Sequence, residues 1–393
     1  MKDGWKTKPL GEVCEVLNGG TPKTGVPEYW DGGHRWITPA EMGKRLSPYI
    51  SETERTLTDL GLRNSSAQML PPNSVILSSR APIGHLVINT EPMATNQGCK
   101  GLIPSSQVGH KFLCYYLSSI VDLLNSLGAG ATFKELSGGK LKEVPIPFPP
   151  LREQQRIVGI LDEAFEGIAT AKANAEKNLQ NARALFDSHL QSVFSKRGEG
   201  WVEKRLGEVY DVRDGTHDSP KYHATGYPLI TSKNLKREGV SFDDVNLINE
   251  EDYTKINQRS AVHKGDVLFA MIGTIGNPTL VTVETKFAIK NVALFKIPSG
   301  QSSAFLKHYL SSSWVILKMM KEAKGATQKF VGLGYLRDFP INVPTLSTQL
   351  DVVANLDVLS EETQRLEALY QRKLEALDAL KKSLLHQAFT GEL

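Results

Sequence analysis

The sequence predicts an α/β (α+β) protein in which one architecture occurs twice. Two globular domains in tandem are separated by two long helices that pair with each other, with approximate two-fold symmetry. Three observations predict this fold: an internal repeat, short strand-like runs at the start of each half, and a long amphipathic stretch that ends each half. The chain has 393 residues and is 40% hydrophobic, which is enough for more than one core.

The repeat has an offset near 195 residues. Gly4-Trp5 and Leu10-Gly11-Glu12-Val13 return, with the same spacing, as Gly200-Trp201 and Leu206-Gly207-Glu208-Val209. The strongest block aligns Gly130 to Asp162 with Gly325 to Asp357, and 14 of its 33 positions are identical. Because the repeat spans the chain, the two halves should share one fold.

Each half begins with β-branched and aromatic runs between turn residues, such as Val75-Ile76-Leu77 and Val267-Leu268-Phe269. A proline-punctuated segment then ends the domain, at Val144 to Pro150 and at Phe339 to Pro344. Proline restricts the residue before it to extended geometry and suits a helix start. We therefore expect domains at 1–150 and 199–345, and helical spacers at 151–198 and 346–393.

The two spacers have apolar residues mostly three or four positions apart and no internal proline, which predicts amphipathic helices. Forty-odd residues give a rod of roughly 60 Å. Gly391 is the expected C-terminal cap of the second helix. The apolar positions are Ile157, Leu161, Phe165, Ile168, Ala175, Leu179, Ala182, Phe186, Leu190 and Val193, then Val352, Leu356, Leu359, Leu366, Leu374, Leu377, Leu384 and Ala388.

Composition restricts the class of protein. The three cysteines have no CxxC spacing, which favours a reducing compartment, and we expect a cytoplasmic protein. Neither an export signal nor a run of 18 apolar residues is found. The net charge is only +3, but the excess of Lys and Arg falls in residues 1–150 (15 against 13 acidic) and 200–345 (19 against 15). This distribution indicates two modestly basic domains joined by neutral-to-acidic helices. It is also compatible with ordinary variation of surface charge.

Two basic domains held at a fixed separation are typical of a protein that recognises two DNA half-sites. The loops of the two halves differ, as in Gly19-Gly20-Thr21-Pro22 against Gly215-Thr216-His217-Asp218. A shared frame with divergent loops predicts two different half-sequences, and therefore an asymmetric bipartite target.

The residues also resemble the specificity subunits of type I restriction-modification systems. The resemblance covers essentially the whole chain and is most specific at Pro149 to Ile157 and at Leu384 to Leu393. The turns Gly20-Thr21-Pro22, Ser79 to Gly84, Thr95 to Gly98 and Asp214 to His217 are similar to those of the family's target-recognition domains. The start of the second helix departs from the family pattern, because only Leu346 and Gln349 are kept.

The resemblance implies that each globular domain is a target-recognition domain and that the two helices form an antiparallel coiled coil. It also implies that each end recruits one adenine-methylating subunit. Those two methyltransferase subunits would hold S-adenosylmethionine. Restriction subunits that translocate and cut DNA would hold ATP and Mg. The chain itself would hold no cofactor and no metal, and would have no catalytic residues.

Bases and phosphates are contacted by Lys, Arg, Asn, Gln, Ser and Thr in loops, so loop composition predicts the DNA-binding residues. In the first domain these are Thr21, Lys23, Thr38, Lys44, Arg80, Asn96, Gln97 and Lys100. In the second they are Arg213, Thr216, His217, Lys221, Ser232, Lys233, Asn234, Lys290 and Asn291.

Structural alternatives stand beside several of these predictions. Asn96 and Gln97 would equally well satisfy the backbone of a turn. His217 is a potential metal ligand, but no second ligand has suitable spacing. Lys134 and Lys329 are the lysines that are identical in the two copies of the repeat block. They could contact phosphates or lie in turns exposed to solvent. Trp5 and Trp201 are expected in the core or against a helix.

Two other functions remain open at this stage. Asp266, Glu284 and Lys286 resemble the acids and lysine of a metal-dependent nuclease, although the first half has Ser74 in place of Asp266. A coiled-coil scaffold that binds only proteins is the other alternative. The chain contains neither a GxxxxGK[ST] phosphate loop nor a tetrapeptide like the Asp-Pro-Pro-Tyr of amino-methyltransferases.

Overall fold

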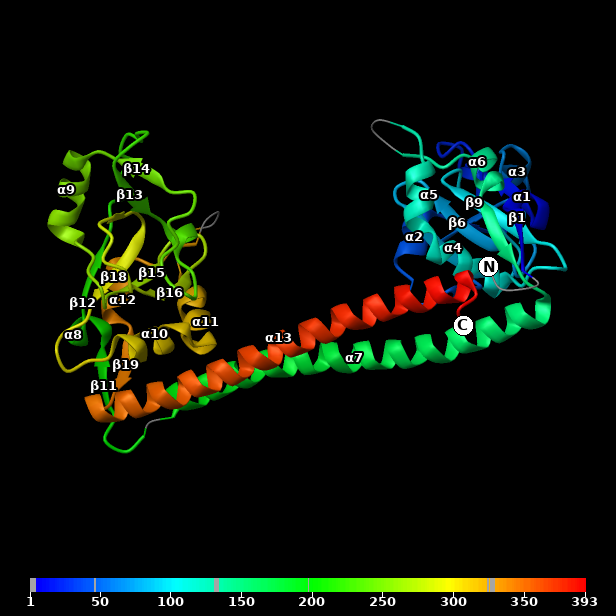
Figure 1. The fold of residues 1–393 in the computed structure, drawn as a ribbon. Coiled ribbons are helices and arrows are strands. Elements are labelled where there is room, and N and C mark those ends of the chain that lie inside the picture. Colours follow the sequence, from blue (N-terminus) through cyan, green and yellow to red (C-terminus); the bar gives the residue numbers. More distant parts are fainter. Residues whose placement is uncertain (1–4, 46, 131–133, 197, 324, 326–328) are drawn as a thin grey trace. The chain divides into compact units, whose positions relative to one another are not determined.

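The structure is a computed structural model that describes residues 5–45, 47–130, 134–196, 198–323, 325 and 329–393. The chain divides into two compact units, residues 1–175 with 372–393 and residues 176–371. Each unit therefore contains one globular part and a portion of each long helix (Figure 1). The repeat residues Gly4, Ala131, Thr132, Ala326 and Thr327 lie outside the described residues.

The globular part of unit 1 contains three sheets. The largest has five strands in the order β2 (Cys14–Asn18), β9 (Cys99–Pro104), β6 (Val75–Ser79), β7 (Ile83–Asn89) and β4 (Tyr49–Ile50). The second has the order β5 (Arg55–Leu57), β3 (Trp30–Ile37) and β8 (Met93–Thr95), and the third pairs β1 (Lys6–Pro9) with β10 (Pro145–Phe148).

Helices connect these strands, and several of them pack against the largest sheet. Before β6 lie α1 (Leu10–Val13), η1 (Pro27–Tyr29), α2 (Pro39–Gly43) and α3 (Asp59–Arg63). After β9 lie α4 (His110–Ser119), α5 (Val121–Leu127) and α6 (Gly138–Glu143), and the long helix α7 runs over Leu151–Ser195.

Unit 2 repeats this arrangement with one strand fewer in its largest sheet. That sheet has the order β12 (Asp211–Asp214), β18 (Val292–Lys296), β15 (Val267–Ala270) and β16 (Gly276–Leu280). The others are β14 (Asn246–Ile248), β13 (Tyr227–Ile230) and β17 (Ala288–Ile289), and the pair β11 (Val202–Arg205) and β19 (Pro340–Val343).

The helices of unit 2 follow the order of those of unit 1, except that η1, which precedes β3, has no counterpart between β12 and β13 in the described residues. They are α8 (Leu206–Val209), η2 (Ser232–Asn234), α9 (Glu250–Ser260), α10 (Ser303–Ser311), α11 (Ser313–Glu322) and α12 (Leu333–Asp338). The second long helix, α13, runs over Leu346–Thr390.

The predicted repeat is confirmed at the level of strand pairing. In unit 1, β2 and β6 both pair antiparallel with β9, and β3 pairs parallel with β8. In unit 2, β12 and β15 both pair antiparallel with β18, and β13 pairs parallel with β17. The predicted strands at Val75-Ile76-Leu77 and Val267-Leu268-Phe269 are β6 and β15.

The core of each globular part continues onto the long helices. In unit 1, Phe112 packs edge-on against Phe389, which lies on α13, with ring centroids 5.2 Å apart. In unit 2, Phe305 packs in the same way against Phe194, on α7, at 5.3 Å. Trp5 and Trp201 pack against the cores of their units, which confirms the structural interpretation of both tryptophans.

A buried glutamine near the start of each long helix makes the same contacts in both units. Gln154 Oε1 accepts from Gly109 N at 2.9 Å, and its Nε2 donates to Pro149 O at 2.9 Å. Gln349 Oε1 accepts from Ser302 N at 2.9 Å, and its Nε2 donates to Pro344 O at 3.0 Å. These bonds satisfy backbone groups that would otherwise be buried without partners, and they fix the angle at which each helix leaves its domain.

Within each unit the two helices run antiparallel. In unit 1 the beginning of α7 and the end of α13 share one core, and Lys172 Nζ lies 2.7 Å from Asp378 Oδ1. In unit 2, Arg183 Nε lies 3.1 Å from Glu367 Oε2. The predicted apolar positions are all buried or half-buried, and Gly391 ends α13 with a φ of 85°. None of the helices in the part of the chain that the structure describes is long and apolar enough to span a membrane.

Candidate nucleic-acid interface

Most of the predicted DNA-binding residues gather at one edge of the main sheet in each unit. In unit 1, Asn18 at the end of β2 lies opposite Lys100 at the start of β9, which lies opposite Leu77 near the end of β6. In unit 2, Asp214 at the end of β12 lies opposite Ala293, next to the start of β18. The loops that contain Thr21, Arg80, Asn96 and Gln97, and those that contain Thr216, His217, Lys290 and Asn291, leave the sheet at these edges.

A glycine at each edge allows two loops to approach closely. A Cβ atom on Gly19 would lie 1.9 Å from the carbonyl oxygen of Asn96, and a Cβ atom on Gly215 would lie 2.1 Å from that of Ile289. Gly19 N donates to Cys99 O at 3.1 Å, and Gly215 N donates to Val292 O at 3.0 Å. The two edges therefore share one backbone frame, which any larger residue at these positions would disrupt.

Charged side chains gather at the edge of unit 1 around Glu135. Its carboxylate lies 3.5 Å from Arg80 Nη1 and 3.9 Å from Lys100 Nζ. The Lys100 side chain is only 7% exposed. Burial lowers the pKa of Lys100, the carboxylate of Glu135 opposes that effect, and the charge of Arg80 adds to it. Lys100 is therefore poorly placed to reach DNA, whereas Arg80 is half-buried beside it.

Asn96 joins two loops of the same edge. Its Nδ2 donates to Thr21 Oγ1 at 2.9 Å, and its Oδ1 accepts from Gly98 N at 2.8 Å. The Asn96 side chain therefore bonds to the backbone of its turn, which is the structural role expected as an alternative to DNA contact. It also orients Thr21. Gln97 next to it is exposed.

The edge of unit 2 is organised by Asp214, whose side chain is 11% exposed. One carboxylate oxygen lies 2.9 Å from His217 Nε2, and the other lies 3.0 Å from Arg259 Nη2. The second ring nitrogen of His217 lies 2.9 Å from Asn291 Oδ1. Both nitrogens of the His217 ring are thus engaged, so its orientation is fixed before any ligand binds. Among the described residues, no group of acids, histidines and cysteines is arranged to hold a metal ion.

The remaining residues of this edge are tied to the same loops. Asn291, with a φ of 55°, donates its backbone N–H to Thr216 O at 3.0 Å. Lys290 Nζ donates to Ser219 Oγ, and its backbone N–H donates to Ile230 O at 2.9 Å. The structure therefore brings together Thr216, His217, Lys290 and Asn291.

A second group lies where β3 and β13 end. Thr38 caps α2, because its Oγ1 accepts from Glu41 N at 3.2 Å. Lys44 is exposed, 3.2 Å from Glu54 Oε1, and Lys233 is exposed, 3.0 Å from Asp244 Oδ2. Asn234 is 2% exposed, and its Oδ1 accepts from Thr231 N at 3.1 Å, which gives it a structural role. Ser232 is half-buried on η2.

Five of the lysines and arginines considered in the sequence lie apart from these clusters or bond to the backbone. Lys23 and Lys221 are exposed in loops. Arg213 Nη2 lies 2.5 Å from Asp211 Oδ2, and this pairing raises the pKa of the guanidinium. Lys134 is exposed, and Lys329 Nζ donates to Met320 O at 3.2 Å.

Sequence reasoning missed Glu135, Asp214 and Arg259. Asp214 is part of the Asp214-Gly215-Thr216-His217 motif, and Glu135 follows Lys134 in the repeat block, so both had a signal in the sequence. Arg259 is at the end of the polar helix α9, about 45 residues from the carboxylate that it binds. No local pattern indicates such a contact.

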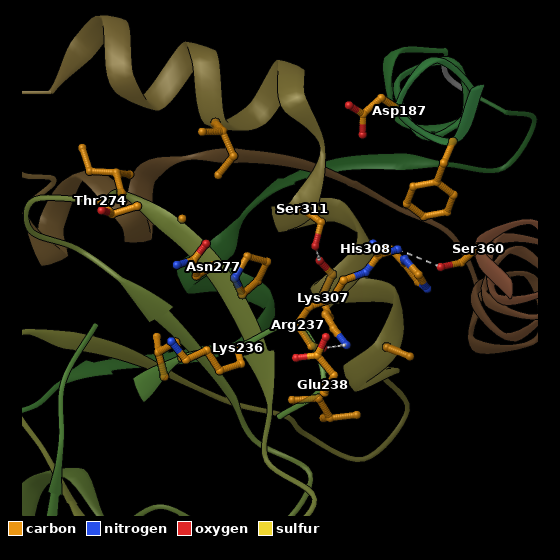
Figure 2. Close-up of a pocket in the computed structure, with 18 of the residues that line it drawn as sticks. Asp187, Lys236, Arg237, Glu238, Thr274, Asn277, Lys307, His308, Ser311 and Ser360 are labelled. Carbon is orange, nitrogen blue, oxygen red and sulfur yellow. Dashed lines mark hydrogen bonds between the residues drawn. The ribbon is translucent and has the colours of Figure 1, made fainter. Parts of the chain in front are cut away.

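Unit 2 also contains a cavity of about 1050 Å³ between its globular part and its portions of the long helices (Figure 2). Arg237 Nη2 donates to Ser360 Oγ at 3.0 Å, and Lys307 Nζ donates to Arg237 O at 3.1 Å. His308 Nε2 lies 2.8 Å from Asp357 Oδ1. Burial lowers the pKa of His308, and Asp357 opposes that effect. These bonds make the cavity wall a joint that fastens the domain to α13.

The residues of the nuclease alternative do not form one cluster. Asp266 is 5% exposed, and its Oδ2 lies 2.6 Å from Lys296 Nζ. Glu284 is paired elsewhere, 3.6 Å from Lys264 Nζ, with its side chain 81% exposed. The buried acid is thus neutralised by a lysine other than Lys286.

Comparison with known proteins identifies the family. The sequence model of the type I restriction modification DNA specificity domain matches residues 2–180 and again 198–376. The chain is 27% identical to the type I restriction enzyme MjaIX specificity subunit of Methanocaldococcus jannaschii, covering 99% of this chain and 93% of that protein. It is 21% identical to the EcoKI specificity subunit of Escherichia coli, covering 100% of this chain and 90% of that protein.

Two solved structures share the fold. A chain from a study of complex assembly and conformational transition in the type I R-M system superimposes with a TM-score of 0.80 at 19% identity, covering 100% of this chain and 99% of that one. The HsdS subunit from Thermoanaerobacter tengcongensis gives a TM-score of 0.66 at 18% identity, with coverage of 100% and 98%. The chain therefore belongs to the specificity subunits of type I restriction-modification systems, which are non-catalytic subunits that recognise DNA.

Proposed function

We propose that this chain reads an asymmetric bipartite DNA target, with one half-site for each globular domain. The observation that carries the proposal is the shared backbone frame at the two sheet edges, on which the side chains differ. Gly19 and Gly215 hold the same turn in place, while Thr21 and Asn96 stand in one half where His217, Lys290 and Asn291 stand in the other. One frame with two sets of polar side chains gives two different half-sequences.

The proposed recognition domains are residues 1–150 and 199–345, and the proposed spacers are 151–198 and 346–393. Within them we propose the exposed or half-buried residues of the two edges as DNA contacts: Thr21, Arg80, Asn96, Gln97, Thr216, His217, Lys290 and Asn291. Thr38, Lys44, Ser232 and Lys233 flank the edges, and Lys23, Arg213 and Lys221 would contact phosphates further out. Lys100 and Asn234 support their neighbours instead, because both are buried.

We further propose that the chain recruits two methyltransferase subunits and the restriction subunits in the cytoplasm. S-adenosylmethionine, ATP and Mg would then be bound by those partners. The helices α7 and α13, of 45 residues each, would set the number of unspecified base pairs between the half-sites, because the length of a helix grows by about 1.5 Å for each residue.

Methylation mapping tests the proposal. The chain would be expressed with the methyltransferase encoded beside it, and methylated adenines would be mapped across genomic DNA at single-base resolution. One asymmetric motif of two short blocks around a gap is the expected result. No methylation by a complex that is assembled and binds its cofactor would contradict it.

DNA binding by the assembled complex can also be measured directly against salt. A reader of DNA should lose affinity with a log–log slope of about −0.9 for each phosphate contacted. A flat response would favour the protein-only scaffold. Inserting four residues between Ala171 and Ala175 should change the gap between the half-sites, whereas an unchanged gap would contradict the role of the helices as a spacer.

A further inference from the structure

The same backbone contact at the two sheet edges identifies pairs of equivalent residues. In unit 1, Leu136 N donates to Ser79 O at 2.9 Å, and Arg80 forms an isolated bridge with Glu135. In unit 2, Val331 N donates to Met271 O at 3.0 Å, and Ile272 forms the same bridge with Phe330. Arg80 is therefore equivalent to Ile272, and Glu135 is equivalent to Phe330.

The third member of the charged cluster is replaced as well. Gly19 N bonds Cys99 O in unit 1, and Gly215 N bonds Val292 O in unit 2. The residue after Cys99 is Lys100, and the residue after Val292 is Ala293, which is fully buried. The cluster of Arg80, Lys100 and Glu135 thus has an entirely apolar counterpart in Ile272, Ala293 and Phe330.

Phe330 is not needed by the core of unit 2. Its neighbour Val331 is 2% exposed and belongs to the core, whereas Phe330 is 40% exposed. Successive side chains of an extended segment point to opposite faces, so Phe330 points away from the core that Val331 enters. An exposed phenyl ring costs solvation energy unless a ligand covers it.

The surroundings of Phe330 indicate what covers it. Ala270, at the end of β15, lies opposite Val292, which follows the Lys290-Asn291 loop, and Ile272 is two residues further along the chain. The ring is therefore part of the edge that presents Asn291 and His217 in unit 2. Among the base edges in the major groove, the apolar group is the C5-methyl of thymine.

We propose that Phe330, supported by Ile272, contacts the C5-methyl group of a thymine in the second half-site. The equivalent place in the first half-site is read by Arg80, oriented by Glu135. This inference rests on the proposed function and extends it, because it names a specificity-determining residue and the base that it recognises.

The test uses the full chain in complex with its methyltransferase subunits, and duplexes that contain the mapped target. Each thymine of the second half-site is replaced in turn by deoxyuridine, which lacks only the methyl group. At one position the wild-type complex should lose affinity about fourfold, the value for burial of one methyl-sized group. Phe330→Ala should weaken binding to unmodified DNA by a similar or larger factor and abolish the difference between thymine and deoxyuridine.

Two further variants make the result specific. Leu317→Ala removes another exposed apolar side chain of unit 2, 66% exposed on α11, and should leave the thymine effect unchanged. Phe330→Leu should retain part of it. Thermal unfolding of Phe330→Ala should match that of the wild type, because the ring lies outside the core.

A wild-type complex that binds its target but responds to no thymine replacement in the second half-site would overturn the methyl contact alone, as would a thymine effect that persists in Phe330→Ala. A second half-site without thymine would overturn it too. A complex that binds no DNA sequence specifically would overturn the proposed function.

Discussion

The two globular parts are fastened to the long helices through equivalent aspartates that have different partners. In unit 1, Tyr115 Oη donates to Asp162 Oδ1 at 2.5 Å, and Lys111 Nζ lies 2.5 Å from Oδ2 of the same residue. In unit 2, Asp357 takes the position of Asp162, and its partner is the imidazole of His308 at 2.8 Å. A phenyl ring of α7 packs on each of these partners, Phe165 edge-on to Tyr115 and Phe186 tilted against His308, but the two rings come from different positions of the repeat.

The difference shows which parts of the repeat are constrained. The backbone frame and the aspartate recur, so geometry is preserved at the joints as it is at the sheet edges. The side chains that bind the aspartate differ between the two units, and their ionisation behaviour therefore differs as well. A phenol and an ammonium keep their protonation state across the neutral range, whereas an imidazole does not.

The largest expected effect comes from breaking the shared frame at a sheet edge. Gly19→Ala and Gly215→Ala each force a Cβ atom into a carbonyl oxygen, so the paired loops must separate. Each should reduce affinity for the target by roughly 5- to 150-fold, which corresponds to the 1–3 kcal/mol typical of overpacking. Gly25→Ala, with nothing within 4 Å of the added Cβ, is the control. Equal binding by Gly19→Ala and Gly25→Ala would contradict the close-approach argument.

The buried glutamines should be equally important in both halves. Gln154→Ala leaves Gly109 N without its acceptor, and Gln349→Ala does the same to Ser302 N. Each should lower the free energy of unfolding by about 1–3 kcal/mol, measured by denaturant titration. Gln155→Ala changes an exposed neighbour and should have little effect. A large effect in one half only would show that the two joints are not equivalent.

Arg80 is a charged residue of the first sheet edge that is replaced by the apolar Ile272 at the second. Arg80→Ala should reduce affinity about tenfold, within the 1–3 kcal/mol of a good base contact, and relax the first half-site at one position. Methylation mapping of the variant checks this, and the second half-site should stay as strict as before. Relaxation of the second half-site would contradict the assignment of Arg80 to the first.

The contact between His308 and Asp357 in unit 2 should make the stability of the protein depend on pH. Burial lowers the pKa of His308 below its ordinary 6.5, so the unfolded chain takes up this proton first as the pH falls. The contribution of His308 to the free energy of unfolding is fully present above about pH 7. It is lost as the pH falls through 6.5 towards the pKa of His308 in the folded protein.

The substitution His308→Tyr reproduces the partner found in unit 1 and should remove this part of the pH dependence. The measurement is the midpoint of unfolding for both proteins between about pH 8 and pH 5.5. His110, in unit 1, also has a pKa lowered by burial, and it is unchanged in the variant, so the difference between the two curves isolates His308. Parallel curves would contradict the prediction.

The sequence predicts most of the frame, because the frame is repeated and follows local patterns. Heptad spacing locates α7 and α13, and the β-branched runs locate β6 and β15. Glycine, threonine and asparagine in turns locate the two sheet edges, since such residues belong where strands end. These signals act over a few residues and need no knowledge of tertiary contacts.

The partners of the site residues are less predictable, since they depend on tertiary contacts. Composition predicts Lys100 and Asn234 as contacts to DNA, yet both are buried, because their strand and cap positions face inward. Arg259 reaches Asp214 from the end of α9, and nothing near it in the sequence indicates this contact. The replacement of the charged pair Arg80 and Glu135 by Ile272 and Phe330 becomes meaningful only in the structure, where a bridge joins the two residues of each pair.

Duplicating one domain tests the central claim, that a common frame presents two independent sets of recognition residues. In this experiment residues 199–345 are replaced by a copy of residues 1–150, and the methylation specificity of the resulting complex is mapped. The account predicts a symmetric target in which the first half-site appears twice, as an inverted repeat with a gap close to the original. An unchanged second half-site, or methylation of an unrelated asymmetric sequence by a folded complex, would contradict it.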